Sequence, residues 1–246
     1  MKTLRILFAL SALMALPSAA LALPALQLGP GAVGSWSYDN GTQTWVNQSN
    51  PFSVNAYANS NTSGANGAYA WDSAGAATQT AYLVISAIPM VNADAFDVTV
   101  ENDGGALAIF DSGFGAPPLE DSNSLAPHGI FDTYFEIYQF NFDGPLTSIG
   151  NTEPGQSGSG DGFVESFDVM INSMVDPVYG VHMDLFVVQG DGTYTPGMTP
   201  DNKLVNAFAP FSHDAESVPN NFDVPEPSSL LLLLVGFAGA LAARRR

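Results

Sequence analysis

Three histidines are the residues whose type and setting best suit metal chemistry in this chain. His128, His182 and His213 are all the histidines it has, and Asp184 and Asp214 stand close to two of them. Imidazole nitrogen and carboxylate oxygen are the ligands that zinc takes when thiolate is missing, so a fold that joined these side chains could bind such an ion. Equally, each histidine could cap backbone groups or face solvent. Because the spacing does not decide between the two, we expect no metal site.

Acids also gather in glycine-rich turns, at Glu101-Asn102-Asp103-Gly104, Gly160-Asp161-Gly162 and Gly190-Asp191-Gly192. Oxygen ligands on such turns suit calcium. No Asp-x-Asp-x-Asp-Gly loop is present, however, and Asp-Gly is itself a common hairpin turn. We therefore expect no cofactor, with calcium as the alternative.

Carboxylates on strands are the remaining candidates for chemistry, since a pair of them can hydrolyse a glycosidic bond. Glu136, Glu165 and Asp168 could line a groove, but nothing selects them among the twenty-four acids of the chain. The sequence has no Gly-x-Ser-x-Gly, His-Glu-x-x-His, phosphate-loop or dinucleotide motif. We expect no catalysis, with a glycoside-active enzyme as a remote alternative.

Aromatic side chains suggest a different function, sugar binding. All three tryptophans and several tyrosines fall in the first third of the exported part: Trp36, Tyr38, Trp45, Tyr57, Tyr69 and Trp71. Rings exposed in a row on a sheet could stack on sugars, which would indicate a carbohydrate-binding module. Buried rings would instead favour a structural role.

The charge of the chain is strongly acidic, with a formal net charge of −18. In residues 23–223 the only basic residue apart from histidine is Lys203. All acids of the chain except Glu226 lie in the same region. Such a field repels nucleic acid and anionic lipid. Nucleic-acid binding is therefore excluded.

The elements that must position these residues are predicted to be strands. In Phe131–Phe140, Phe135 and Ile137 alternate with Tyr134, Glu136 and Tyr138, as expected for a half-buried strand. The other predicted strands are Thr42–Asn47, Phe52–Ala58, Thr80–Ile88, Ala95–Glu101, Phe163–Ile171, Val181–Val187 and Leu204–Phe208.

No stretch of this region has a helical period. Eight to ten strands with turn-rich spacers predict an all-β fold, a single antiparallel β-sandwich or jelly-roll-like domain. Residues 59–77 and 150–162 are predicted loops, and 217–229 is a Pro-rich linker.

The N-terminus has the features of a secretory signal peptide. Lys2 and Arg5 precede an apolar stretch, and Ala20-Leu21-Ala22 is a small-x-small cleavage site, so we expect cleavage after Ala22. The chain has no cysteine, so the exported domain is held by its core and not by disulfides.

The C-terminus ends in a short apolar segment, Leu230–Ala243, followed by Arg244, Arg245 and Arg246. As a helix it would be about 21 Å long against a hydrocarbon core of about 30 Å, which makes a poor permanent span. The arginines would stay cytoplasmic, so everything before the segment lies outside. Pro225 and Pro227 favour an extended backbone, the form that a processing protease grips.

This tail resembles the PEP-CTERM sorting signal of Gram-negative bacteria that secrete an exopolysaccharide. The resemblance rests on Val224-Pro225-Glu226-Pro227, the Leu-rich segment and the terminal arginines, about one tenth of the chain. It implies processing near Pro-Glu-Pro by an exosortase-type transpeptidase, after a membrane-tethered precursor stage. The discarded tail is then comparable to that of a glycolipid-anchor signal.

Several short phrases in the domain also resemble PEP-CTERM proteins of the choice-of-anchor N type, which carry no assigned activity. They are Ser49-Asn50-Pro51-Phe52, Pro127-His128-Gly129-Ile130, Val181-His182-Met183-Asp184-Leu185 and Phe208-Ala209-Pro210-Phe211-Ser212-His213-Asp214-Ala215.

Together these features predict a signal peptide (1–22), a β-sandwich ectodomain (23–216), a linker with the sorting motif (217–229) and a hydrophobic helix with an Arg tail (230–246). The expected function is that of an exported protein at the cell surface or in an exopolysaccharide matrix, with a structural or adhesive role. A carbohydrate-binding module is the alternative.

Overall fold

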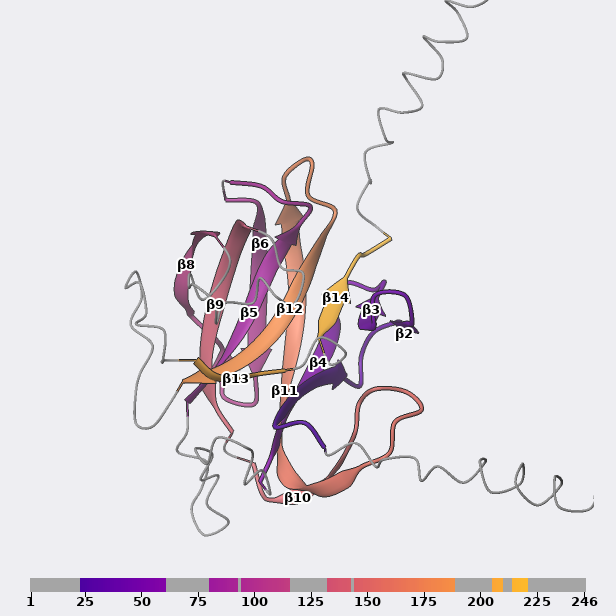
Figure 1. The fold of residues 1–246 in the computed structure, drawn as a ribbon. Coiled ribbons are helices and arrows are strands. Elements are labelled where there is room, and N and C mark those ends of the chain that lie inside the picture. Colours follow the sequence, from indigo (N-terminus) through magenta and orange to yellow (C-terminus); the bar gives the residue numbers. More distant parts are fainter. Residues whose placement is uncertain are drawn as a thin grey trace, which may run out of the picture.

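A computed structural model of the chain describes residues 23–60, 80–92, 94–115, 132–142, 144–188, 205–209 and 214–220. Within these ranges the chain consists of strands and loops (Figure 1), so the predicted all-β class is confirmed. None of the described segments is a helix that could cross a bilayer. The expected signal peptide and the C-terminal hydrophobic segment lie outside the described residues.

The first sheet has six strands, all paired antiparallel. In spatial order they are β1 (Leu26–Pro30), β4 (Phe52–Asn59), β11 (Ser159–Met174), β6 (Phe96–Asn102) and β7 (Gly105–Ala106), with β10 (Thr147–Gly150) paired to one end of β11.

The second sheet has eight strands. Their order is β2 (Trp36–Asp39), β3 (Thr44–Asn47), β14 (Ala215–Ser217), β12 (Gly180–Val188), β5 (Thr80–Ile88), β9 (Thr133–Asn141) and β8 (Ile109–Gly115), with β13 (Val205–Phe208) beside β12. Figure 1 shows β14 between β3 and β12. β14 and β3 run parallel, so this sheet is mixed and not purely antiparallel as predicted.

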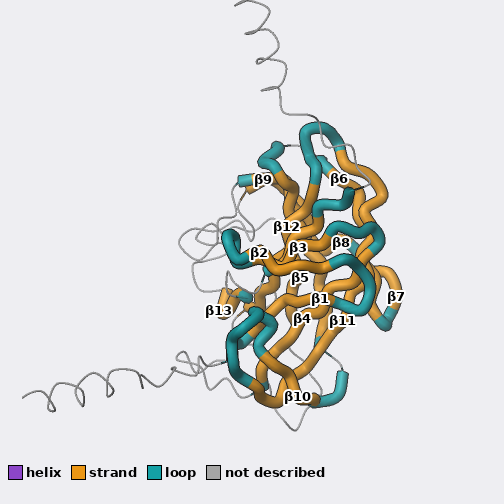
Figure 2. Tube along the Cα trace, turned by 90° about the vertical axis from the view of Figure 1, so that its right-hand side faces the viewer, coloured by secondary structure: helices purple, strands orange, loops and turns teal. Residues whose placement is uncertain are grey.

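The two sheets pack face to face around one hydrophobic cluster, as in a β-sandwich. In β11 the inward residues Phe163, Phe167, Val169 and Ile171 share one face, as the sequence predicts. Each fully buried side chain of this size stabilises the fold by about 1.5–3 kcal/mol. Figure 2, turned by 90° from Figure 1, shows that strands (orange) make up most of the described chain and that loops (teal) connect them.

The central strands β12, β5 and β9 of the second sheet are buried on both faces, which the sequence does not predict. Val181, Met183, Leu185 and Val187 of β12 face the other sheet, and His182 and Asp184 lie on the opposite face as expected. That opposite face is covered as well. Its buried residues are Tyr82, Val84, Phe135, Ile137 and Phe186. The rings of Tyr82 and Phe186 are fully buried and stack with centroids 4.9 Å apart.

Strand β9 shows the same property. Phe135 and Ile137 are fully buried, and Glu136, on the other side of the strand, is only 3% exposed. The expectation of a half-buried strand is therefore wrong here. It rested on the polar character of Glu136, which the neighbouring Tyr134 and Tyr138 accommodate within the core.

Two of the predicted turns can be checked. Asn102 to Gly105 makes the β6–β7 turn, in which the Asn102 side chain accepts a hydrogen bond from Gly104 N at 3.1 Å. Gly160-Asp161-Gly162, in contrast, lies inside β11 and pairs with β10 and β4. The predicted loop at 150–162 is thus shorter, because pairing resumes at Ser159.

Candidate polar site between strands 12 and 14

Two neighbouring strands bring four ionisable side chains to one face of the second sheet. His182 and Asp184 are two residues apart on β12, and Asp214 and Glu216 are two residues apart at β14. Side chains at this spacing point to the same side of a strand. The antiparallel register places His182 directly opposite Glu216. The sequence therefore builds the site from two short alternating patterns.

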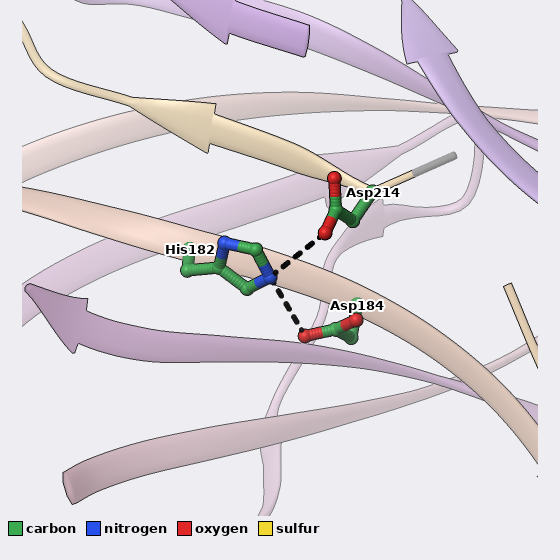
Figure 3. A group of neighbouring side chains, drawn as sticks. All are labelled: His182, Asp184 and Asp214. Carbon is green, nitrogen blue, oxygen red and sulfur yellow. Dashed lines mark ion pairs between the residues drawn. The ribbon is translucent and has the colours of Figure 1, made fainter. Parts of the chain in front are cut away.

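The imidazole of His182 lies at the centre of the group. Its Nε2 atom is 3.1 Å from Oδ2 of Asp184 and 3.5 Å from Oδ2 of Asp214. Dashed lines in Figure 3 mark these two ion pairs. Its Nδ1 atom is 3.1 Å from Oε1 of Glu216. One ligand atom from each of His182, Asp184 and Asp214 lies within 4.8 Å of the other two.

These side chains are buried but poorly satisfied. The side chains of Asp184 and Asp214 are 1% exposed, and that of His182 is 13% exposed. Neither oxygen of either aspartate, nor Nε2 of the histidine, makes an aligned hydrogen bond. The two aspartate oxygens are thus near Nε2, but the geometry is not that of a hydrogen bond. Buried carboxylates without donors are costly unless a cation or a proton neutralises them.

The electrostatics follow from this crowding. Burial raises the pKa of Asp214 to about 8, where the nearby His182 opposes the shift and Asp184 adds to it. For His182, burial lowers the pKa, but the carboxylates of Asp184, Glu216 and Asp214 outweigh it and hold the pKa well above the usual value. In the absence of a bound cation, the group therefore holds protons near neutral pH.

Strands on either side fix the frame of the site. On β3, Trp45 N donates to the Asp214 carbonyl at 3.3 Å, which holds the start of β14 in place. The hydroxyl of Thr44 donates to the Thr42 carbonyl at 3.2 Å. On β5, Ser86 pairs with His182 and its buried hydroxyl has no hydrogen-bond partner.

The structure thus brings together three of the residues that the sequence offered for a metal cluster: His182, Asp184 and Asp214. His128 and His213 lie outside the described residues. Sequence reasoning missed Glu216. The signal was the repeat of acids in Asp214-Ala215-Glu216, opposite His182-Met183-Asp184, but a three-residue strand next to the linker was not predicted. One imidazole and two carboxylates can hold a proton or a divalent cation.

The other acids proposed for chemistry are not brought together. Glu136 is on β9 of the second sheet, whereas Glu165 and Asp168 are on β11 of the first. Glu165 is buried and accepts a hydrogen bond from Asn102 at 2.9 Å, and Asp168 is exposed on the opposite face. Asp168 therefore points away from the two buried glutamates. The predicted processing residues lie outside the described ranges: Ala20, Ala22, Val224, Pro225, Glu226, Pro227, Arg244, Arg245 and Arg246.

Comparison with known proteins adds one informative match. Residues 223–246 match the PEP-CTERM protein-sorting motif. No curated protein matches the chain. A solved structure described as "AvmM Catalyzes Macrocyclization in Alchivemycin A Biosynthesis" is similar with a TM-score of 0.35 and 10% identity, over 77% of this chain and 97% of that chain. A likeness at that level supports no conclusion about this protein.

The motif match covers the tail and not the domain in front of it, so the choice-of-anchor N assignment stays a prediction. The motif does confirm the sorting signal predicted from the Pro-Glu-Pro sequence, the apolar segment and the arginines. The chain carries a PEP-CTERM sorting motif, which implies an exported protein that passes through a membrane-anchored precursor and is processed by an exosortase.

Proposed function

We propose that the exported domain is a structural and adhesive protein of an exopolysaccharide matrix or of the cell surface, without catalysis of its own. The observation that carries this proposal is the packing of the described aromatic rings. Of the rings proposed for sugar contact, the described ones, Trp36, Tyr38, Trp45 and Tyr57, are all partly buried and none is fully exposed.

Trp36 and Trp45 make this point directly. Both are partly buried against the core cluster. Trp36 packs edge-on against Phe52 with centroids 5.8 Å apart, and Trp45 packs against Tyr38 at 5.2 Å. The Trp45 indole N–H donates to the Thr152 carbonyl at 3.0 Å. Rings held in this way stabilise the fold, whereas a sugar platform needs a free face.

A surface pocket of about 300 Å³ on the first sheet fits the same proposal. Its one aromatic residue, Phe52, is fully buried and offers no face for stacking. The rest of the lining combines small, aliphatic and acidic side chains: Val33, Pro51, Thr99, Glu101, Asp168, Val169 and Met170. Trp71 and Tyr69, the other rings proposed for sugar contact, lie outside the described residues.

The separation of the candidate acids supports the absence of glycoside hydrolysis. The two carboxyl groups of such enzymes face each other across the substrate at about 5–9.5 Å. Glu136 is enclosed by two tyrosine hydroxyls, and Glu165 and Asp168 point to opposite faces of another sheet.

Co-sedimentation tests the proposal. The purified full-length chain is mixed with the exopolysaccharide of its own host, and both the bound protein and the newly released reducing ends are measured. An adhesive protein sediments with the polymer and releases no reducing ends. Release of reducing ends would establish an enzyme, and protein that stays in the supernatant would contradict the adhesive role.

Competition then separates adhesion from the alternative of a carbohydrate-binding module. Short oligosaccharides made from the same polymer would displace a module with a defined sugar site. They would leave a charge-based, multivalent attachment in place. Displacement at stoichiometric oligosaccharide would therefore favour the module.

A further inference from the structure

We propose that His182, Asp184 and Asp214 form a binding site for one divalent transition-metal ion of the zinc class. In this arrangement Glu216 is a positioning residue that orients the histidine. The inference is independent of the proposed matrix role, because it concerns what holds the domain together.

The first support is the convergence of buried atoms that lack hydrogen-bond partners. Nε2 of His182 and the oxygens of Asp184 and Asp214 are enclosed and find no aligned donor or acceptor, and one ligand atom of each residue lies within 4.8 Å of the others. Folded proteins rarely leave such atoms unsatisfied. A cation between them would satisfy them together.

The second support is the spacing of the atoms. Zinc bonds to nitrogen and carboxylate oxygen are about 2.0–2.2 Å long, so the edges of a tetrahedral site are about 3.3–3.5 Å. The distances from Nε2 to the nearer oxygens of Asp184 and Asp214 are 3.1 and 3.5 Å. Two of the three ligand separations therefore match a single tetrahedral ion, and the third, between the two aspartate oxygens, is within 4.8 Å.

Glu216 provides the third support. Its Oε1 atom lies 3.1 Å from Nδ1 of His182 and accepts a hydrogen bond when that nitrogen carries the proton. This tautomer directs the lone pair of Nε2 toward the two aspartates. Metal-binding histidines are commonly held by such a carboxylate on their second nitrogen.

The ligand set favours zinc over calcium. Calcium takes six to eight oxygen ligands on flexible loops, whereas this group has one nitrogen and two carboxylates fixed on paired strands. Three protein ligands with a fourth position left for water suit a tetrahedral ion.

The bound ion would connect the last strand of the sheet to its middle. β14 has only three residues, and its antiparallel pairing with β12 covers Val181 to Met183. A metal ion bound by His182, Asp184 and Asp214 would link β12 to the residue directly before β14, and so hold this short strand at its N-terminal end. The sorting motif begins soon afterwards, at residue 223.

Zinc titration of the full-length chain tests the proposal. The protein is stripped with EDTA, exchanged into buffer and titrated with ZnCl₂ by calorimetry, and its thermal unfolding is followed with and without zinc. We expect one zinc ion per chain and a higher Tm with zinc. Asp184→Asn and Asp214→Asn should each weaken binding at least 100-fold, and Glu216→Gln by about 10–100-fold.

Glu136→Gln is the matched control, since it alters another buried acid of the same sheet and should keep the wild-type affinity. Wild-type protein that binds no zinc, or that binds calcium more tightly, would overturn the proposal. So would Asp184→Asn protein with unchanged affinity.

Should the aspartate variants fail to fold, crystals of the wild-type protein grown with zinc decide the matter. An anomalous peak at the zinc edge within bonding distance of Nε2 of His182 is the expected result. A zinc peak only elsewhere in the molecule would overturn the proposal.

Discussion

Buried acids lie on both faces of the second sheet, in a first group made of Glu136 with its tyrosines and a second made of Asp184 and Asp214 with His182. The two groups differ in the partners that surround the carboxylates. On the inner face, Glu136 is surrounded by the hydroxyls of Tyr134 and Tyr138, at 3.1 and 2.5 Å from its oxygens. On the other face, Asp184 and Asp214 have no hydroxyl or amide donor in hydrogen-bond geometry. The protein supplies two hydroxyl donors to Glu136, whereas Asp184 and Asp214 have only the imidazole of His182 beside them.

The difference arises from what each strand places two residues away. In β9 the neighbours of Glu136 at this spacing are both tyrosines, so alternation places a donor on each side of the acid. In β12 the neighbours of Asp184 at this spacing are His182 and Phe186, and at β14 the described neighbour of Asp214 is Glu216. Glu136 therefore receives its hydrogen bonds from its own strand, whereas the oxygens of Asp184 and Asp214 remain without hydrogen bonds.

The largest expected effect comes from His182→Leu, which removes the only basic group of the second site. Two buried carboxylates then face each other, and we expect a loss of about 3–5 kcal/mol in the free energy of unfolding at neutral pH. Urea unfolding in the presence of EDTA measures it. Adding Asp184→Asn and Asp214→Asn to this variant should restore most of the stability. A loss below about 1 kcal/mol for His182→Leu would show that the acids need no cation.

Tyr138→Phe tests the first group. Glu136 would lose its shorter hydrogen bond while staying buried, at a cost of about 1–3 kcal/mol by urea unfolding. Tyr134→Phe is the control of the same size, and its longer contact should cost less. Equal effects of the two variants would mean that contact length does not rank the donors.

Glu136→Gln tests how pH acts on the first group. Burial raises the pKa of Glu136 in the folded chain, although the tyrosine hydroxyls oppose the shift. The protonated form is therefore favoured by folding, and this stabilisation is present below the unfolded pKa of about 4.5 and is lost as pH rises through the folded value. Glu136→Gln should remove this loss of stability. The free energy of unfolding of the variant, relative to wild type, should therefore increase as pH rises from about 4.5 through the folded pKa of Glu136. A constant difference from pH 4 to pH 8 in urea titrations would contradict it.

The smallest effect is expected for Ser86→Ala, beside the second site. The Ser86 hydroxyl is buried and has no partner, so its removal should change stability by no more than about 0.5 kcal/mol. Thermal unfolding measures the change, with and without zinc. A loss above about 1 kcal/mol would show that this hydroxyl serves the carboxylates after all.

The longer strands could be predicted from sequence because their patterns are clear. Thr80–Ile88 has the predicted bounds, and Phe163–Ile171 lies within β11 with its apolar face inward. The short strands β2, β7 and β14 were not predicted, because so few residues show no clear period. Two other four-residue strands, β3 and β13, do lie within predicted segments, Thr42–Asn47 and Leu204–Phe208. Which face of β9 met the core was also beyond prediction, since both of its faces are buried.

The candidate site could be predicted only in part. The types of His182, Asp184 and Asp214 suggested a ligand set, and alternation placed the first two on one face of a strand. Their meeting with Asp214 and Glu216 depends on a pairing between segments more than thirty residues apart, which no local pattern encodes. The sorting motif, in contrast, is contiguous in sequence and was predicted completely.

The parallel pairing of β3 with β14 bears on the timing of export. In the sheet order, β14 is the strand through which β2 and β3 join β12 and the rest of the second sheet. A chain that crosses the membrane from its N-terminus presents β3 early and β14 last. The sandwich therefore closes only once residue 217 has emerged, just before the sorting motif that begins at residue 223. During export, the last strand of the fold and the sorting motif therefore emerge almost together.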